Sequence, residues 1–355
     1  MSSDPAALAP TRACDFYRTL VLRRQLTLLA LAAALVLSLC TDLALGPARY
    51  SLGQVVEALL WPGRVDEQVR VILWDIRMPV ALMALVVGAS LSVAGMQMQT
   101  ILNNPLASPF TLGISAGAGF GAALALAFGV ALFPFAVEYV IPINAFLMAM
   151  LTSLAIYGLS LRRGVNNETI ILLGIALVFI FNALMSLIQF FASQQAVAAV
   201  VFWTMGSLTK ATWPKLWISV AVLAVAMPLL LRRGWALTAM RLGDAKAESM
   251  GVSLRGLRLE VLMIVSLLAS ISVSFVGTIG FIGLVGPHIA RMLLGEDQRF
   301  LLPGAALSGA LILSIGSVLS KMIIPGTVIP IGIVTSIAGI PFFLYLILSR
   351  RAASW

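Results

Sequence analysis

The chain has 355 residues, of which 61% are apolar and only 10% are charged, and its mean hydropathy is +1.04. A soluble core could not hide so much apolar surface, whereas a lipid bilayer acts as its solvent. The formal net charge of +9 comes from basic residues between apolar runs. This pattern favours a protein that crosses a membrane several times and excludes a basic nucleic-acid-binding surface.

The apolar runs predict an all-α, polytopic membrane protein of about ten transmembrane helices. Several runs are shorter than an untilted span, and such segments are tolerated where protein or an aqueous cavity covers the backbone, as in transporters. The runs are 27–45, 78–102, 112–130, 143–161, 169–190, 213–231, 259–278, 282–294, 303–323 and 331–349.

The basic residues predict the orientation of these spans. Alternating ten spans from a cytoplasmic N-terminus puts most of the 23 basic residues in the cytoplasm, as the positive-inside rule requires. We therefore expect a cytoplasmic N-terminal tail over residues 1–25, one integral-membrane domain over residues 26–351 and both termini in the cytoplasm. The first run is long for a cleavable signal peptide, so we expect it to remain as a span. Cys14 and Cys40 lie in different environments, which argues against a disulfide or a cysteine metal site.

The first outer loop contains a short predicted helix. Ser51 is a suitable N-cap, and Leu52, Val55, Val56, Leu59 and Leu60 follow on one face. Trp61, Pro62 and Gly63 end the pattern. We expect this helix to lie along the outer membrane interface.

The largest inner loop, residues 232–258, alternates apolar and charged residues. It predicts one or two short amphipathic helices that are broken at Gly243 and Gly251. An ordinary solvated loop would have similar composition. A structured, half-apolar loop would also be a docking surface for a cytoplasmic partner.

Motifs for chemistry are few. No Gly-x-x-x-x-Gly-Lys-Ser/Thr loop occurs, and the small residues at 307–310 indicate helix packing. Ser115 lies in a Gly-x-Ser-x-Gly pattern and, with the single His288, leaves an intramembrane serine protease as a remote alternative. We predict no catalytic residue and no metal site, because the methionines are not matched by Cys or His at ligand spacing. His288 is better interpreted as structural than as a haem ligand or proton relay.

The acidic residues fall at span ends or in loops. A transporter that is driven by protons or sodium usually needs a buried carboxylate or a carbonyl site. The sequence therefore favours an external source of energy over an ion-coupled secondary transporter.

A series of motifs carries a family resemblance. They are DIRMP (75–79), VGASLSVAGMQ (87–97), NPLASP (104–109), LGIS (112–115), WTMGS (203–207), LGD (242–244), GFIGLVGPHIAR (280–291), LPG (302–304), PIGIV (330–334) and GIPFF (339–343). The chain resembles the FecCD-type permease subunit of bacterial type II ABC importers for iron-siderophores, haem and cobalamin. The resemblance covers nearly all of the chain beyond its N-terminal tail.

The resemblance implies a cobalamin-permease-like fold in the bacterial cytoplasmic (inner) membrane. It also implies a permease dimer, expected to be a homodimer, around a central pathway. Two copies of a cytoplasmic ABC ATPase would hold the ATP and Mg, so this chain binds no cofactor and is not itself an enzyme. A periplasmic or tethered binding protein would deliver the cargo. We expect membrane lipid as a further partner and no nucleic acid.

The resemblance also assigns residues to roles, by their match to the motifs of the family. ATPase coupling falls on Leu242, Gly243, Asp244, Ala247, Met250 and Gly251. The cytoplasmic gate is expected at Asn166, Asn167 and Glu168, and binding-protein docking at Arg77 and Lys321. For the translocation path we expect Met96, Gln97, Gln99 and Asn104.

Three positions depart from the family pattern. Val80 replaces an Arg, Ser317 replaces an Asp in the ninth span, and Val328 replaces a Glu in the last outer loop. These changes lie near the outer face, so the docking ion pairs are expected to be fewer or rearranged. The expected cargo is a ferric-siderophore-class chelate, with haem or cobalamin as the alternative.

Overall fold

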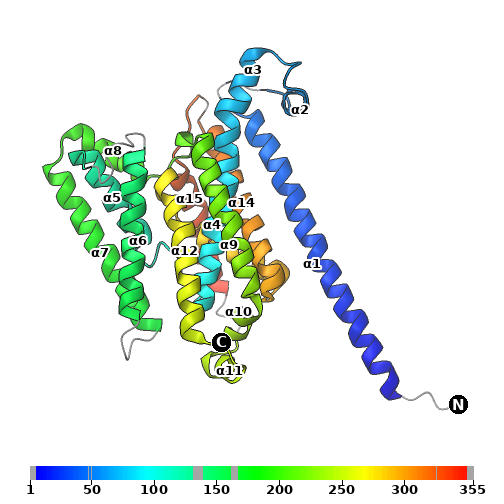
Figure 1. The fold of residues 1–355 in the computed structure, drawn as a ribbon. Helices are drawn as coiled ribbons and strands as arrows, with labels where there is room; N and C mark the ends of the chain where they lie inside the picture. Colours follow the sequence, from blue (N-terminus) through cyan, green and yellow to red (C-terminus); the bar gives the residue numbers. More distant parts are fainter. Residues whose placement is uncertain are drawn as a thin grey trace.

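The computed structural model describes residues 5–46, 48, 50–130, 139–160, 167–324 and 326–349. Within these ranges the chain is helical and contains no strand (Figure 1). A π-helical segment (Ile72–Arg77) joins α3 to α4, and a 3₁₀ turn (Leu208–Lys210) precedes α9. The helices are α1 (Pro5–Ala44), α2 (Leu52–Leu60), α3 (Glu67–Val71), α4 (Met78–Ile101), α5 (Ile114–Phe128), α6 (Val140–Ser160), α7 (Asn167–Phe191), α8 (Gln194–Thr204), α9 (Trp213–Arg232), α10 (Gly234–Met240), α11 (Asp244–Ser249), α12 (Leu254–Val276), α13 (Ile282–Leu294), α14 (Gln298–Met322) and α15 (Ile331–Ser349).

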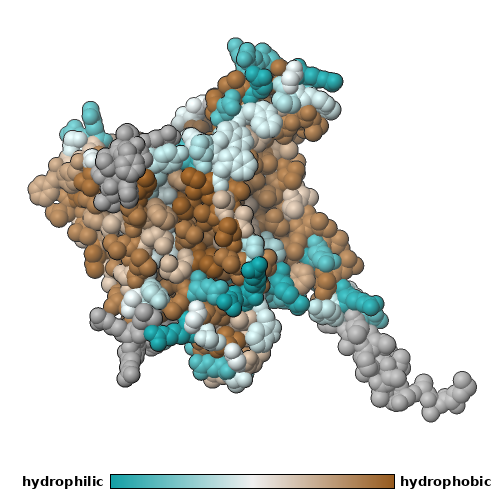
Figure 2. Space-filling model, in the orientation of Figure 1, coloured by the Kyte–Doolittle hydropathy of each residue, from teal (hydrophilic) through white to brown (hydrophobic). Residues whose placement is uncertain are grey.

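Seven helical segments of the described chain are long and apolar enough to cross a membrane, and α5, α13 and α15 are shorter apolar helices. Together they coincide with the ten predicted spans and confirm the predicted fold class. Figure 2 shows an apolar band between two hydrophilic zones. We call the zone that carries α2 and α3 the α3 end, and the opposite zone, with α10 and α11, the α11 end (Figure 1).

The first helix is longer than the apolar run at its centre. It begins at Pro5, so helix continues through most of the segment that we expected to be a tail. Its main packing partner is α14, and its last turns also meet α2 and α4. Toward the N-terminus α1 diverges from the bundle (Figure 1). Before it diverges, α1 is held along α14 by Ser38 Oγ, which lies 2.8 Å from Ser314 Oγ, and by Arg24, which lies 3.6 Å from Asp297.

The short helix α2 forms as the sequence predicts. The Ser51 hydroxyl accepts a hydrogen bond from the Gln54 backbone N–H at 3.2 Å, and Gln54 Oε1 accepts one from the Ser51 N–H at 2.9 Å. This capping box satisfies two helix-end donors. Val55 is buried, while Leu52 and Leu60 are exposed, so only part of the predicted apolar face packs against the protein.

Helix α4 is the central helix of the bundle and packs against α9, α12, α13 and α14. Small residues permit this close approach. A Cβ atom at Gly88 would overlap the carbonyl oxygen of Gly309 on α14, and one at Gly95 would overlap that of Gly283 on α13. Ser92 Oγ donates to the Ala305 carbonyl at 2.6 Å. The interpretation of residues 307–310 as a packing face is therefore confirmed.

We expect Gly95→Ala to destabilise the bundle, because the added methyl meets the backbone of α13. Overpacking typically costs about 1–3 kcal/mol, and a backbone neighbour cannot move aside easily. The matched control is Gly158→Ala on α6, where nothing lies within 4 Å of the added atom. Its effect should be neutral or stabilising, since Ala favours helix. Thermal unfolding in detergent tests both, and equal midpoints would contradict the packing role of Gly95.

The Gly-x-Ser-x-Gly segment also serves packing. A Cβ at Gly117 would overlap Thr152 on α6, and one at Gly121 would overlap the Asn144 carbonyl. Ser115 itself is buried. His288, on α13, packs edge to face against Phe342 of α15, with ring centroids 6.1 Å apart. The geometry thus gives the protease alternative no support.

Backbone hydrogen bonds join the broken helices near the α3 end. The Ser207 N–H donates to the Val276 carbonyl at 2.7 Å, and the Ile331 N–H donates to the Gly206 carbonyl at 3.1 Å. Gly277, at φ +78°, ends α12 beside them. These bonds satisfy the polar groups that chain breaks expose inside a membrane protein, so the short helices α13 and α15 are tolerated.

Candidate functional site

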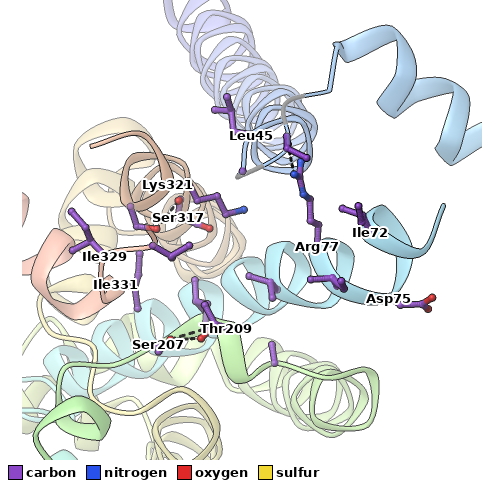
Figure 3. Close-up of a pocket in the computed structure, with 18 residues that line it drawn as sticks. Leu45, Ile72, Asp75, Arg77, Ser207, Thr209, Ser317, Lys321, Ile329 and Ile331 are labelled. Carbon is purple, nitrogen blue, oxygen red and sulfur yellow. Dashed lines mark hydrogen bonds between the residues drawn. The ribbon is translucent and has the colours of Figure 1, made fainter. Parts of the chain in front are cut away.

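A cavity of about 530 Å³ opens at the α3 end (Figure 3). Its walls come from the end of α1, the π-helical segment before α4, the loop before α9, the last turns of α14 and the loop before α15. Both residues that we expected to dock a binding protein line it: Arg77 and Lys321. In Figure 3, Lys321 and Ser317 lie together on α14, and Arg77 extends toward the end of α1 near Leu45.

Arg77 is buried and caps α1. Its Nη1 donates to the carbonyl oxygens of Leu43 at 2.7 Å and Ala44 at 3.2 Å, and its Nη2 donates to that of Ala48. The guanidinium carbon lies 4.9 Å from the ring centroid of Tyr50. The last carbonyl groups of a helix have no partner within the helix, and a cation there also meets the negative end of the helix dipole. Arg77 therefore holds the end of α1.

Lys321 makes a buried ion pair with the same helix. Its Nζ lies 2.9 Å from Asp42 Oδ1 and donates to the Asp42 carbonyl at 3.0 Å. Ser317 Oγ contacts both carboxylate oxygens, at 3.0 and 3.1 Å. The Asp42 side chain is fully buried, and that of Lys321 is 9% exposed. Cations of the π-helical segment before α4 and of α14 thus clamp the end of α1 from two sides.

These contacts correct one expectation. We expected Arg77 and Lys321 to dock a binding protein at the outer surface, but both side chains point inward and bind partners within the chain. Asp42 lies at the end of its span, where the sequence places it, but its side chain is fully buried. The sequence held a signal for this, because Asp42 falls inside the predicted run 27–45. Ser317, which replaces the Asp common in the family, binds this carboxylate from α1.

The predicted coupling loop forms two short helices, α10 and α11, at the opposite end. Gly243 and Gly251 adopt φ values of +97° and +83°, which only glycine reaches without strain, and they bound α11 as predicted. Leu242 is 57% exposed and Met250 is 44% exposed. The loop therefore offers apolar side chains at the surface of a strongly basic end of the bundle.

Ala247 is the exception among the predicted coupling residues. It is fully buried and belongs to the main core, together with Leu237 and Met240 of α10 and Leu254 and Leu257 of α12. We expected it on the docking surface, and that placement is wrong. Ala247 instead attaches α11 to the bundle.

Two of the three predicted gate residues lie in the first turn of α7, which begins at the α11 end (Figure 1). Asn166 is outside the described residues. Asn167 is the first residue of α7, and Glu168 is exposed in its first turn. A carboxylate at this position is favoured by the positive end of the helix dipole. The gating role itself stays a prediction.

The residues proposed for the translocation path lie mostly inside the protein. Met96, Gln97 and Gln99 are buried, so they do not face a second subunit in this conformation. Gln97 Nε2 donates to Gln298 Oε1 at 3.2 Å, and Gln99 Nε2 donates to the Gly283 carbonyl at 3.2 Å. Asn104 is partly exposed. Its Oδ1 accepts a hydrogen bond from the Leu106 N–H at 2.8 Å in the loop after α4.

Within the described residues no group of three His, Cys, Asp or Glu could hold a metal ion. A bundle of ten apolar helices, with short helices that begin inside it and a helical loop at one end, defines a polytopic membrane protein. The chain belongs to the FecCD transport family, whose pattern matches residues 34–349.

Relatives of this chain are permeases with several cargoes in their names. The haemin transport system permease HmuU of Yersinia pestis is 35% identical over 316 residues, 89% of this chain and 95% of the relative. A Helicobacter pylori permease named for iron chelatin transport is 41% identical over 282 residues, which are 79% of this chain and 83% of the relative. The vitamin B12 import permease BtuC of Serratia proteamaculans is 35% identical over 289 residues, which are 81% of this chain and 85% of the relative.

A solved structure agrees with this assignment. It is described as an inward-facing conformation of a metal-chelate type ABC transporter, and it matches with a TM-score of 0.80 and 30% identity over 91% of this chain and 99% of that one. The chain is therefore an ABC importer permease, a transport subunit of the FecCD family.

Proposed function

We propose that the chain imports a ferric-siderophore-class chelate across a bacterial cytoplasmic membrane and is driven by two copies of a separate ABC ATPase. The observation that carries this proposal is the loop of α10 and α11, a structured surface with exposed Leu242 and Met250. The sequence has no phosphate-binding loop of its own, so ATP and Mg belong to the partner.

Charge supports the proposed orientation. Most of the basic residues that the structure describes lie at the α11 end. They include Arg232, Arg233, Arg241, Lys246 and Arg255. By the positive-inside rule this end faces the cytoplasm, where the ATPase would bind. Both termini would then be cytoplasmic, and the cavity at the α3 end would face the binding protein.

A second permease subunit completes the proposed pathway. Helices α7 and α15 expose large apolar side chains, such as Phe179, Phe190 and Ile337. Such a surface needs lipid or another copy of the permease to cover it. We propose a homodimer, and the pathway side chains are to be sought on exposed faces because the glutamines of α4 are buried.

We propose that the binding protein docks at the α3 end through cations other than Arg77 and Lys321. Arg64, Arg70 and Lys210 are exposed there among the described residues. Exposed charges contribute little to affinity but accelerate encounter with an acidic partner.

Transport in proteoliposomes tests the proposal. The permease, its ATPase and its binding protein should accumulate labelled ferric siderophore only when ATP is present. A catalytically inactive ATPase should abolish uptake, and uptake that persists would overturn the ATP-driven mechanism. Uptake that is driven by an ion gradient without the ATPase would establish a secondary transporter instead.

Haem or cobalamin is the second candidate for the cargo, because relatives of similar identity carry these names. Competition decides between them. An excess of unlabelled ferric siderophore should suppress uptake, whereas haemin and cobalamin should not. Suppression by haemin or cobalamin alone would reassign the cargo and leave the ATP-driven mechanism intact.

A further inference from the structure

Arg258, in the second turn of α12, lies where three elements meet. Its Nη2 is 2.9 Å from both carboxylate oxygens of Asp244, the first residue of α11. Its Nε donates to the carbonyl oxygen of Ile101, the last residue of α4, at 3.1 Å. One side chain thus joins the exposed loop helix to the central helix of the bundle.

The contact with Ile101 falls at a vulnerable point of the chain. The last carbonyls of a helix lack partners within it, and a charged donor stabilises them more strongly than a neutral one does. Two residues further on, Asn103 has a φ of +45°, a left-handed conformation that Asn adopts more readily than other residues with a side chain. The loop 102–113 then leads into α5. Arg258 therefore holds the start of this loop as well as the end of α4.

We propose that Arg258 is a positioning residue that transmits a displacement of α11 to the end of α4 and to the loop 102–113. The inference rests on the proposed ATPase-driven function, in which α11 is the element that the ATPase moves. Because α4 packs against α9, α12, α13 and α14, a shift at its end reaches most of the bundle. The planar guanidinium can hold both partners at once in a fixed geometry, which an ammonium cannot.

The loop offers a matched control in Arg233, which follows the last residue of α9. Its Nε donates to Glu260 Oε1 at 3.0 Å and its Nη2 lies 2.8 Å from Glu260 Oε2. This hydrogen bonding to Glu260 raises the pKa of Arg233 above its ordinary value. Like the pair of Asp244 and Arg258, this is an arginine–carboxylate pair within 3.0 Å, but it joins the end of α9 to α12 and does not involve the end of α4.

The first test measures cargo transported per ATP hydrolysed in proteoliposomes. Arg258→Gln should retain ATPase association and hydrolysis, while uptake per ATP falls about tenfold. Arg258→Lys should retain part of the cargo transported per ATP, and Arg233→Gln should leave this ratio at the wild-type value. The exchange Asp244→Arg with Arg258→Asp restores an ion pair between α11 and α12 but provides no donor for Ile101, so it should remain uncoupled. Full rescue by this exchange, or an equal loss in Arg233→Gln, would overturn the proposal.

The second test needs no transport. Hydrogen exchange of the permease alone in detergent should show the amides of residues 102–113 exchanging about tenfold faster in Arg258→Gln than in wild type, and unchanged in Arg233→Gln. Unchanged exchange in Arg258→Gln would overturn the link to α4. A wild-type chain without ATP-dependent uptake would overturn the proposed function. The hydrogen-exchange measurement would still decide whether Arg258 links α11 to the end of α4.

Discussion

Replacing Lys321 with methionine should lower the free energy of unfolding by about 3–5 kcal/mol, the cost typical of removing one partner of a buried ion pair. Among the described residues, the change leaves the fully buried carboxylate of Asp42 with the hydroxyl of Ser317 as its one hydrogen-bonding side chain. Thermal unfolding of the purified permease in detergent should show a midpoint lower by several degrees. Lys210→Met, at an exposed lysine of the same end, should leave the midpoint unchanged.

The double variant Asp42→Asn, Lys321→Met separates the ion pair from the packing around it. Removing both charges avoids the unpaired buried carboxylate, so most of the lost stability should return. If Lys321 served instead as a free docking charge, Lys321→Met would keep the wild-type midpoint and would slow association with the binding protein. That outcome would contradict the clamp on the end of α1.

The sequence predicted those parts of the fold that depend on local pattern. Apolar runs of sufficient length located the ten helices, because a bilayer demands that length regardless of tertiary contacts. Ser51 as N-cap located the start of α2, and the structure adds Gln54 as its partner in a capping box. Gly243 and Gly251 located the ends of α11, since their positive φ angles suit glycine. Each of these signals lies within a few residues of its effect.

The sequence did not predict the direction in which side chains point. Helix α4 is buried on almost every side, so it has no apolar stripe from which to infer that Gln97 and Gln99 face protein. Arg77 and Lys321 stand at span ends, so the sequence located them near the outer surface. It did not reveal that Arg77 binds backbone carbonyls at the end of α1 or that Lys321 binds the carboxylate of Asp42. Such pairings join residues far apart in the chain, and one sequence carries little information about them.

The exposed side chains of Leu242 and Met250 form the surface that the ATPase would contact. Met250→Asp should weaken association with the ATPase by at least about tenfold, because losing an anchor residue at the centre of an interface costs about 2 kcal/mol or more. Met250 is exposed, so the midpoint of thermal unfolding should stay at the wild-type value. Leu242→Asp should behave in the same way, and binding of the ATPase to the permease in nanodiscs measures both.

Ala247→Arg provides the contrast, because Ala247 is fully buried between α11 and the core. An arginine there would be a buried, unpaired charge, so this variant should lower the unfolding midpoint even without the ATPase. A surface role for Met250 and a packing role for Ala247 therefore predict opposite results. Met250→Asp should weaken ATPase binding and keep the unfolding midpoint, whereas Ala247→Arg should lower the unfolding midpoint even without the ATPase. If Met250→Asp binds the ATPase as tightly as wild type does, the exposed apolar side chains of this loop are not its contact surface. The helices α10 and α11 would then serve mainly to close the α11 end of the bundle.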